Sequence, residues 1–553
     1  MKPIVHGSFM RLSLLAVALA QALPVLAAPA VNQPDAGRTL QENAPALEAP
    51  RVSPALNIEA PIAGEGPAGG VSTTLLSVSF SGNSLFSEAA LLNELGQVTG
   101  QSYDLAGMRR LSNRITAFYR AQGYPFARAY LPPQPMNDGK LLIAVVEGKY
   151  GQVQAIGDET MTAGAQKFLP PLKPGVVIMS SVLERVALIL DDLPGVKVVP
   201  VMRPGQEVGT GDLDVRVTRE SSVGGDVGLD NHGNRYTGSV RATANLEFNS
   251  PILFGDQITL RGLYTEENLW FGALGYNVPL GSSGLRGQLE YAHTYYELGK
   301  EFTSLNATGT AKVSSAGLSY PIIRAQKANL SIMATWQHKR LQDNNATTSD
   351  HKSSDGLPVT LNFDLRDSLG GGGLTYGSTR WTHGNLDLNG ALKIADQNAQ
   401  TDGSFNKFNL DIARLQTLPA GFSLFARASA QWSTDNLDSS EGFGLGGVSG
   451  VRAYPSGEAF GDEGWLTQIE LRYKINAFTP YAFHDSGRIK VNHEPWASGN
   501  NHRSVSGAGI GVRMNQGAWS ADASLAARTH GGKPESDTED DNPRFWLKAG
   551  YQF

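Results

Sequence analysis

The chain has 553 residues, a formal net charge of −6 and only 18% charged residues. This balance, without a long basic run, excludes a nucleic-acid-binding surface built on positive charge. The chain has no cysteine, which excludes disulfides, thiolate metal sites and a cysteine nucleophile, and which is typical of a compartment that oxidises thiols.

Residues 1–28 are predicted to be a secretory signal peptide. Lys2 and Arg11 precede an apolar run that ends at Leu26, and small residues follow it. This run is too short to cross ~30 Å of hydrocarbon as a helix. No other apolar run in the sequence approaches the length that a spanning helix needs, so a membrane-spanning part would have to be a β-barrel.

Residues 29–73 are rich in Pro, Ala and Gly, a composition typical of a linker. Within them, residues 35–42 are a candidate short helix that Asp35 would cap. An unstructured tether is the alternative for this stretch.

Two stretches of similar length repeat one order of predicted elements: strand, helix, helix, strand, strand. The first is residues 74–148, in which Asp104 caps a helix that ends at Gly123. The second is residues 149–219. This internal repeat predicts two small α+β domains. Each would leave a sheet edge open, and an open edge can bind an extended chain.

From residue 220 to 553 the helical pattern disappears, and about sixteen alternating segments remain, which suits the even strand number of a closed bacterial barrel. One of these segments is residues 357–366. An extracellular β-sandwich also alternates, but its strands are seldom this long and seldom end so often in aromatic residues. The predicted fold is therefore mainly β, a 16-stranded transmembrane antiparallel β-barrel preceded by two α+β domains.

Two segments give the clearest evidence for strands with one face toward lipid. One begins at Trp465 and alternates apolar side chains with polar ones, among them Gln468 and Glu470. The other is the last segment, in which Tyr551 and Phe553 complete an apolar face. A terminal aromatic on an alternating strand resembles the signal that the outer-membrane assembly machinery reads, so we assign that role to these two residues.

A glycine-rich loop, residues 435–463, lies between two of the alternating segments, and we call it the lid loop. A sixteen-stranded barrel has a lumen wide enough to conduct, so something has to occupy it, and this loop is the candidate. An arginine in such a loop is more often solvated. Folded inward, however, it would need a carboxylate partner. The tetrapeptide at the centre of the lid loop is Val451, Arg452, Ala453 and Tyr454.

Asp485 is the acid that the sequence offers to Arg452. It lies on a later, otherwise aromatic segment, between Phe483 and Gly487. A planar guanidinium can bind a carboxylate through two hydrogen bonds, which lysine cannot do. The sequence therefore predicts an ion pair that fixes the lid loop to the barrel wall.

Motifs for covalent, metal or nucleotide chemistry are absent from the sequence. It contains no Gly-x-Ser-x-Gly, His-Glu-x-x-His, Walker loop or EF-hand spacing, and its histidines are scattered singly. The acidic run at 535–541 is interpreted as a solvated loop, with calcium binding as the alternative. We expect no catalytic residues, no metal, no cofactor and no enzymatic activity.

The chain resembles the two-partner secretion transporters, the TpsB group of the Omp85 superfamily, over nearly its whole mature length. The two α+β units look like POTRA domains, and residues 190–196 look like the second POTRA signature. Residues 230–238 resemble the first barrel hairpin of the family. The superfamily tetrad Val-Arg-Gly-Tyr (or -Phe) is present with Ala453 in place of the usual glycine. The partner-strand motif Phe-x-Asp-x-Gly is matched by Phe483, Asp485 and Gly487.

The resemblance implies a bridge between Arg452 and Asp485 inside the barrel, and a plug helix at 35–42. It also implies an outer-membrane pore with its POTRA domains in the periplasm. Such a pore would recognise an unfolded partner exoprotein, a TpsA-type adhesin, haemolysin or toxin, and export it without ATP. Outer-membrane lipid and the assembly machinery are the other expected partners, and nucleic acid is not one.

Two rival functions remain open from the sequence. An outer-membrane insertase of the same superfamily shares POTRA domains and barrel, although insertases usually carry more POTRA units than this chain has room for. A passive porin or a barrel enzyme is the second rival. The periplasmic repeat argues against the porin, and the missing nucleophile constellation argues against the enzyme.

Overall fold

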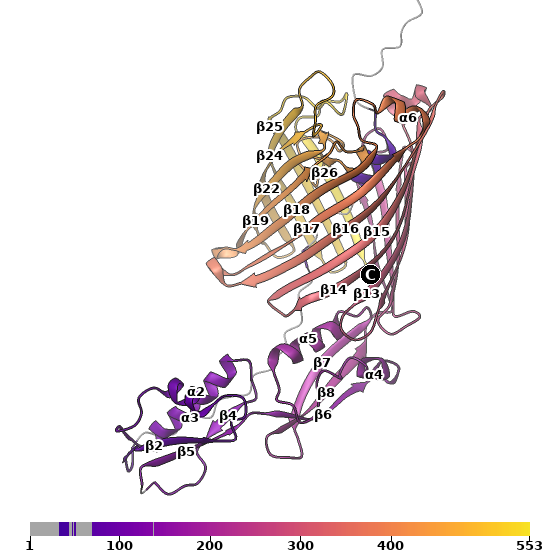
Figure 1. Ribbon diagram of the computed structural model, residues 1–553. Helices are drawn as coiled ribbons and strands as arrows, with labels where there is room; N and C mark the ends of the chain where they lie inside the picture. Colours follow the sequence, from indigo (N-terminus) through magenta and orange to yellow (C-terminus); the bar gives the residue numbers. More distant parts are fainter. Residues whose placement is uncertain (1–32, 44–46, 48, 51–68, 137) are drawn as a thin grey trace, which may run out of the picture.

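The computed structural model describes residues 33–43, 47, 49–50, 69–136 and 138–553. The predicted signal peptide, residues 1–28, lies outside these ranges. Two α/β units lie in sequence order below one end of a closed β-barrel (Figure 1). Within the described ranges, no helix combines the length and the apolar character needed to cross a bilayer.

The first α/β unit packs two helices on a three-stranded sheet of order β2-β5-β4, in which β2 and β5 are parallel. Leu91, Ile115 and Ile143 are fully buried between helices and sheet. Asp104 caps α3 as expected, because its Oδ1 accepts a hydrogen bond from the Gly107 amide at 2.7 Å. The elements are β1 (Thr73–Thr74), β2 (Ser77–Ser81), α2 (Glu88–Leu95), β3 (Ser102–Tyr103), α3 (Leu105–Ala121), β4 (Arg128–Tyr130) and β5 (Lys140–Val146).

The second α/β unit repeats the order strand, helix, helix, strand, strand without counterparts of the short strands β1 and β3, and its sheet has the equivalent order, β6-β8-β7. Its core is a separate apolar cluster around Met161, Leu190 and Val217. The outer strands of this sheet, β6 and β7, each pair on one side only within the sheet. The elements are β6 (Lys149–Gly157), α4 (Glu159–Gln166), α5 (Ser180–Asp191), β7 (Val196–Pro204) and β8 (Thr210–Arg219).

The second unit is attached to the barrel by polar contacts of α5 and its C-cap, Asp192, and by Phe254 of the barrel, which packs against the apolar core of the unit. Arg324, the last residue of the barrel strand β14 (Thr308–Arg324), donates to both carboxylate oxygens of Asp192, at 2.6 and 2.7 Å. Arg185 of α5 donates to the Pro321 carbonyl at 2.7 Å. The interface thus combines ion pairs and hydrogen bonds with apolar packing of Phe254 against Phe168.

The barrel consists of sixteen antiparallel strands, and β26 pairs with β9 to close it. The predicted fold class is therefore confirmed. The strands are β9 (Val223–Asp230), β10 (Arg241–Asn249), β11 (Gln257–Thr265), β12 (Trp270–Pro279), β13 (Arg286–Glu297), β14 (Thr308–Arg324), β15 (Ala328–Asn344), β16 (Ser349–Asp367), β17 (Gly373–Leu388), β18 (Gly403–Thr417), β19 (Phe422–Ser433), β22 (Glu463–Tyr473), β23 (Phe478–Lys490), β24 (His502–Gln516), β25 (Trp519–His530) and β26 (Arg544–Gln552).

One strand is much longer than its alternation predicts. The sequence indicates a strand at 357–366, whereas β16 runs from Ser349 to Asp367. Its first half is polar and lacks the apolar face of a lipid-contacting segment. That half is held instead by backbone pairing with β15 and β17, which are also long. Backbone hydrogen bonds between strands do not require lipid, so a strand can continue beyond its lipid-contacting part as long as its neighbours do.

Along β22, successive side chains point alternately to the outer surface of the barrel and into the lumen. Trp465 and Ile469 are 45% and 50% exposed on the outer surface, whereas Gln468 and Glu470 are 6% and 3% exposed because the lumen is filled. In the last strand, the apolar face that ends near Tyr551 is likewise exposed. The observed alternation is that of a barrel with a lipid-facing outside and a polar inside.

The short helix α1 (Ala36–Glu42) lies inside the barrel (Figure 1). Asp35 caps it by accepting from the Arg38 amide at 2.8 Å, and the Ala36 amide donates to Asp343 of β15 at 2.9 Å. Gln41 donates to the carbonyl of Ser440. The stretch thus forms a docked helix rather than a free tether.

Candidate functional site

The lid loop enters the lumen and packs against the inner wall. It contains η4 (Ser439–Glu441), β20 (Phe443–Gly444) and β21 (Phe460–Gly461), the last two paired with each other. Gly447, with φ of +89°, and Gly450 form the turn before the central tetrapeptide, and a Cβ on Gly450 would overlap the Leu445 carbonyl. The Val451 amide then donates to that carbonyl at 2.6 Å. This tight turn directs the next side chain at the wall.

Arg452 is buried and holds two carboxylates from two adjacent strands. Its Nε and Nη2 donate to the two oxygens of Asp485 on β23, at 2.8 and 2.7 Å, and its Nη1 donates to Glu470 on β22 at 2.6 Å. The Arg452 backbone amide adds a further bond to Asp485 at 3.1 Å. Arg452 is 3% exposed and Asp485 is fully buried. The guanidinium is therefore satisfied by charge-assisted bonds.

The motif residues around Asp485 share one face of β23. The guanidinium carbon of Arg452 lies 3.6 Å from the centroid of the Phe483 ring, a cation–π contact. At Gly487, an added Cβ would come within 2.6 Å of the Leu445 side chain of the lid loop. Phe483 thus stacks on the guanidinium, Asp485 binds it, and Gly487 leaves room for the loop.

The other lid-loop residues are buried as well. Ala453 has no positive φ, so a side chain is tolerated there, and its methyl group fits against Gly507 of β24. The Tyr454 hydroxyl donates toward the carbonyls of His530 and Gly532, at 2.8 and 3.0 Å. The tetrapeptide therefore contacts β22, β23, β24 and the end of β25.

Sequence reasoning missed two contacts of Arg452. Glu470 was recognised as inward-facing but was not paired with the lid loop, although its position on the polar face of β22 was an available signal. Trp546 on β26 donates from Nε1 to the Arg452 carbonyl at 2.7 Å. Nothing in the local sequence indicates this contact, because the residue lies far along the chain.

The site is a balanced cluster of charges. Glu470 also accepts from Arg513 at 2.9 Å and from Arg472 at 2.8 Å. Arg513 in turn donates to Asp522 at 2.7 Å. Alternating cations and carboxylates satisfy each other without a net local charge. Such a cluster can hold two elements in one register, but it is costly to break one partner at a time.

A second polar cluster fixes the beginning of the lid loop. Glu441 of η4 binds Lys339 of β15 at 2.5 Å and Lys407 of β18 at 2.8 Å. Asp438 binds Lys352 at 2.6 Å. Because η4 also contacts α1, these bonds connect the lid loop, α1 and the wall.

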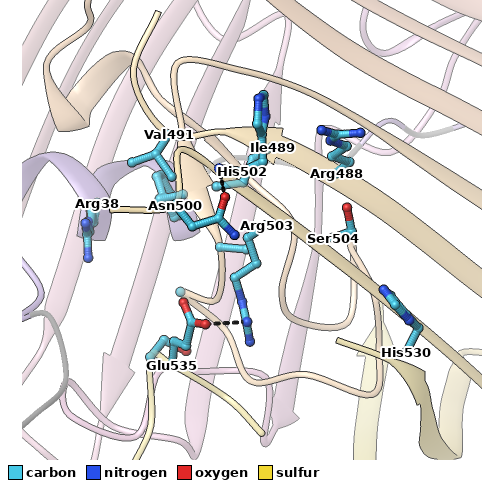
Figure 2. A pocket seen from close by; sticks show the side chains of 14 residues that line it. Arg38, Arg488, Ile489, Val491, Asn500, His502, Arg503, Ser504, His530 and Glu535 are labelled. Atoms are coloured by element: carbon cyan, nitrogen blue, oxygen red, sulfur yellow. Dashed lines mark hydrogen bonds and ion pairs between the residues drawn. The ribbon is translucent and has the colours of Figure 1, made fainter. Parts of the chain in front are cut away.

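A cavity of about 590 Å³ lies beside the lid loop at the end of the barrel away from the α/β units. Figure 2 shows Arg38 of α1 on one side of it and Arg503 of β24 on the other, with Arg503 paired to Glu535. Arg503 also donates to Glu458 of the lid loop at 2.7 Å. The cavity is thus a polar gap between α1, the lid loop and the wall, and its lining carries three arginines, Arg38, Arg488 and Arg503, and one acidic residue, Glu535.

A closed sixteen-stranded barrel whose lumen holds a loop and a helix, with two α/β units at one end, defines an outer-membrane barrel transporter. Comparison with known proteins is more specific. The chain belongs to the haemolysin secretion/activation family ShlB/FhaC/HecB, whose model matches residues 209–514. Residues 73–148 match the ShlB-type POTRA domain.

Three similar proteins illustrate this relationship. The heme/hemopexin transporter protein HuxB of Haemophilus influenzae (strain 86-028NP) is 28% identical over 476 residues, 83% of each chain. The structure of CdiB from Escherichia coli has a TM-score of 0.73 at 20% identity, covering 91% of this chain and 94% of CdiB. BamA from Haemophilus ducreyi, lacking POTRA domains 1–3, reaches only 0.50 at 12% identity, covering 87% of this chain and all of that one.

The family places the protein in the Gram-negative outer membrane as a two-partner secretion pore with its POTRA end in the periplasm. The strand ends nearest the α/β units are therefore periplasmic, and the opposite ends are extracellular. The cavity of Figure 2 lies at the extracellular end. The likeness to BamA concerns the barrel fold alone.

Proposed function

We propose that this chain exports one unfolded exoprotein through its barrel, and that the lid loop and α1 are the elements that close the pore between transport events. The observation that carries this proposal is the buried Arg452, held by Asp485 and Glu470. At the centre of the lid loop one residue binds two strands, and the ion pairs of Glu441 and Asp438 hold the beginning of the loop, so polar contacts that can be exchanged fix the loop in the lumen. We assign the protein no catalytic step and no cofactor.

We call the ion pairs of Arg452 with Asp485 and Glu470 the latch. Such ion pairs suit a reversible closure better than a permanent one. An apolar interface of the same size would bind the loop without requiring a partner for each charge. Here the gain from pairing is largely offset by the desolvation of the charges, so the net stability of the closed state is small. The same charges nevertheless define one register of the loop against β22 and β23.

The periplasmic units supply open sheet edges for the client. We propose residues 74–148 and 149–219 as two POTRA domains, and the outer strands β4 and β7 as edges to which an extended client segment could add. On β7, Val199 is 49% exposed. Main-chain hydrogen bonds would provide affinity and alternate side chains specificity. Folding of the client outside the cell would then give transport its direction.

The final strand carries the proposed assembly signal. Tyr551 and Phe553 are 37% and 52% exposed on the outer face, with ring centroids 6.5 Å apart. An exposed aromatic pair at the end of the last strand is accessible to a machinery that inserts barrels into the membrane. Lipid contacts the same face once the barrel is inserted.

Arg452→Ala tests the latch. The variant should insert normally yet secrete little or no partner exoprotein into the medium. Arg414→Ala is the matched control, because Arg414 also pairs with a carboxylate, Asp367, but at the periplasmic end of the wall. Normal secretion by the Arg452 variant, or an equal defect in the control, would refute the role of the latch.

Depletion of the protein separates export from barrel insertion. Loss of one secreted protein with a normal outer-membrane protein profile supports the exporter. A broad loss of outer-membrane proteins would support the insertase instead.

A further inference from the structure

Three basic side chains form a row on the outer surface of the wall. His293 of β13, Lys312 of β14 and Arg340 of β15 are successive cross-strand partners. We call these three residues the basic ladder. Like charges directly opposite one another destabilise a sheet unless something compensates them. Figure 1 shows β13, β14 and β15 as neighbouring strands of the wall.

The outward direction of the ladder follows from the residues beside it. Lys339 points inward, where it binds Glu441 of the lid loop, so the adjacent Arg340 faces outward. Val313 is buried on the luminal side, so the adjacent Lys312 faces outward as well. Lys312 and Arg340 are both exposed. The ladder therefore faces the membrane rather than the transport path.

The ladder lies at the level of the lipid headgroups. A transmembrane strand crosses the hydrocarbon in about 9–11 residues. β15 begins at Ala328 on the periplasmic side, so the hydrocarbon ends near His338, and Arg340 lies just beyond. Outward aromatic residues mark the same boundary, as they do in outer-membrane barrels. Among those that are at least 39% exposed on the extracellular side are Tyr264, Trp270, Trp336, Trp381, Phe408, Trp432, Trp465 and Phe545.

Two of these tryptophans pack against histidines that belong to the basic ladder or lie beside it. The Trp270 ring lies 4.8 Å from the His293 ring, and the Trp336 ring stacks on His338 at 6.2 Å. His338 accepts from Arg340 Nε at 3.1 Å and bonds Asp355 through Nδ1 at 2.9 Å. Arg340 is thus oriented by His338. Within the described ranges, no acidic side chain contacts Lys312 or Arg340.

We propose that the basic ladder binds the phosphate groups of lipid A, the glycolipid of the outer leaflet. Lys312 and Arg340 would supply the charge, with Arg340 offering its two outer nitrogens to phosphate oxygens. The anion would relieve the repulsion between the opposed cations. The apolar surface below, including Trp336 and Leu318, would receive the acyl chains.

A titration of the purified full-length protein with bisphosphorylated lipid A tests this site. Lys312→Gln and Arg340→Gln should each weaken binding about tenfold, since each removes one charge-assisted contact. Lys327→Gln is the matched control, because Lys327 is an exposed lysine at the periplasmic turn of the same hairpin. It should bind as the unchanged protein does. Lys312→Arg should retain binding, which shows that charge rather than disturbed folding is responsible.

Two further probes define the ligand. Dephosphorylated lipid A should bind weakly, and inorganic phosphate alone should not displace the intact glycolipid. Equal binding of the dephosphorylated lipid, or an equal loss in the Lys327 variant, would overturn the proposal. Complete displacement by inorganic phosphate at matched concentration would overturn the lipid as the ligand.

Discussion

Trp546 and Arg452 are joined by a hydrogen bond from the indole Nε1 to the backbone carbonyl, 2.7 Å long and buried. Trp546 belongs to the final strand, β26, which pairs with the first strand, β9, and closes the barrel. The lid loop is therefore attached to the strand that completes the wall, in addition to β22 and β23. The closing strand β26 therefore contacts the lid loop through Trp546, which itself pairs with Ser524 of β25.

Trp546→Phe keeps an aromatic ring but removes the donor. The Arg452 carbonyl would then be buried without this partner, at a cost of about 1–3 kcal/mol. We expect the lid loop to leave its closed position more often, which should appear as more frequent channel openings in planar lipid bilayers. Trp519→Phe, on the outer face of β25, is the control and should leave the conductance unchanged. If the Trp546→Phe variant opens no more often than the unchanged protein, this prediction is wrong.

Asp485→Asn should damage the latch more than Asp522→Asn. Breaking a buried ion pair by neutralising one partner costs about 3–5 kcal/mol. Asp522 belongs to the same cluster but contacts Arg513 and Tyr481 instead of Arg452. Export should therefore fall strongly for Asp485→Asn and weakly for Asp522→Asn, measured as secreted exoprotein per inserted barrel. Equal losses would show that the cluster acts only as a general stabiliser.

Gly37→Ala should displace the plug helix. A Cβ at Gly37 would overlap Ser439 Oγ and come within 2.5 Å of the Ser440 amide nitrogen, so α1 cannot keep its seat against η4. We expect a higher steady ion conductance of the reconstituted barrel. Gly272→Ala is the matched control, because nothing lies within 4 Å of the added methyl. If Gly37→Ala conducts no more than Gly272→Ala, α1 does not limit the pore.

Glu147 makes the first α/β unit sensitive to acid. Burial alone would raise the pKa of this carboxyl, but bonds from the Ser84 hydroxyl and the Leu85 and Ser84 amides outweigh it and hold the pKa below its usual range. A lowered folded pKa contributes stability that is present above the unfolded pKa of about 4.3 and is lost as the pH falls through the folded value.

Hydrogen exchange of the full chain can measure this effect. Protection of β5 should be constant at neutral pH and should fall below about pH 4. Glu147→Gln should lose protection at neutral pH by about 1–3 kcal/mol and should flatten the acid dependence. An unchanged acid dependence in this variant would show that another carboxyl is responsible.

The barrel could be predicted from the sequence because the alternation of apolar and polar side chains is a local pattern that recurs from strand to strand. On β22, alternate side chains face the lipid and the lumen, as the outer Trp465 and the inner Glu470 illustrate. The length of β16 could not be predicted in the same way. Its polar half is determined by strands β15 and β17, and no property of residues 349–356 alone indicates them.

The site was predictable in part for a different reason. Asp485 follows from the need of a buried guanidinium for a carboxylate and from the motif that surrounds it. Trp546 could not be found, because its contact depends on how the ends of the wall meet in three dimensions. The docking of α1 is similar, since the acceptor for Ala36 is Asp343, on a strand far along the chain.

The position of α1 has a consequence for biogenesis. This helix is synthesised before any strand of the wall, yet it lies in a chamber that β26, synthesised last, encloses. Its seat includes Asp343 of β15 and Ser440 of the lid loop, neither of which exists until most of the polypeptide has been made. This helix must therefore be among the last elements to reach its native position, and a nascent barrel passes through an interval in which α1 does not yet occupy the lumen.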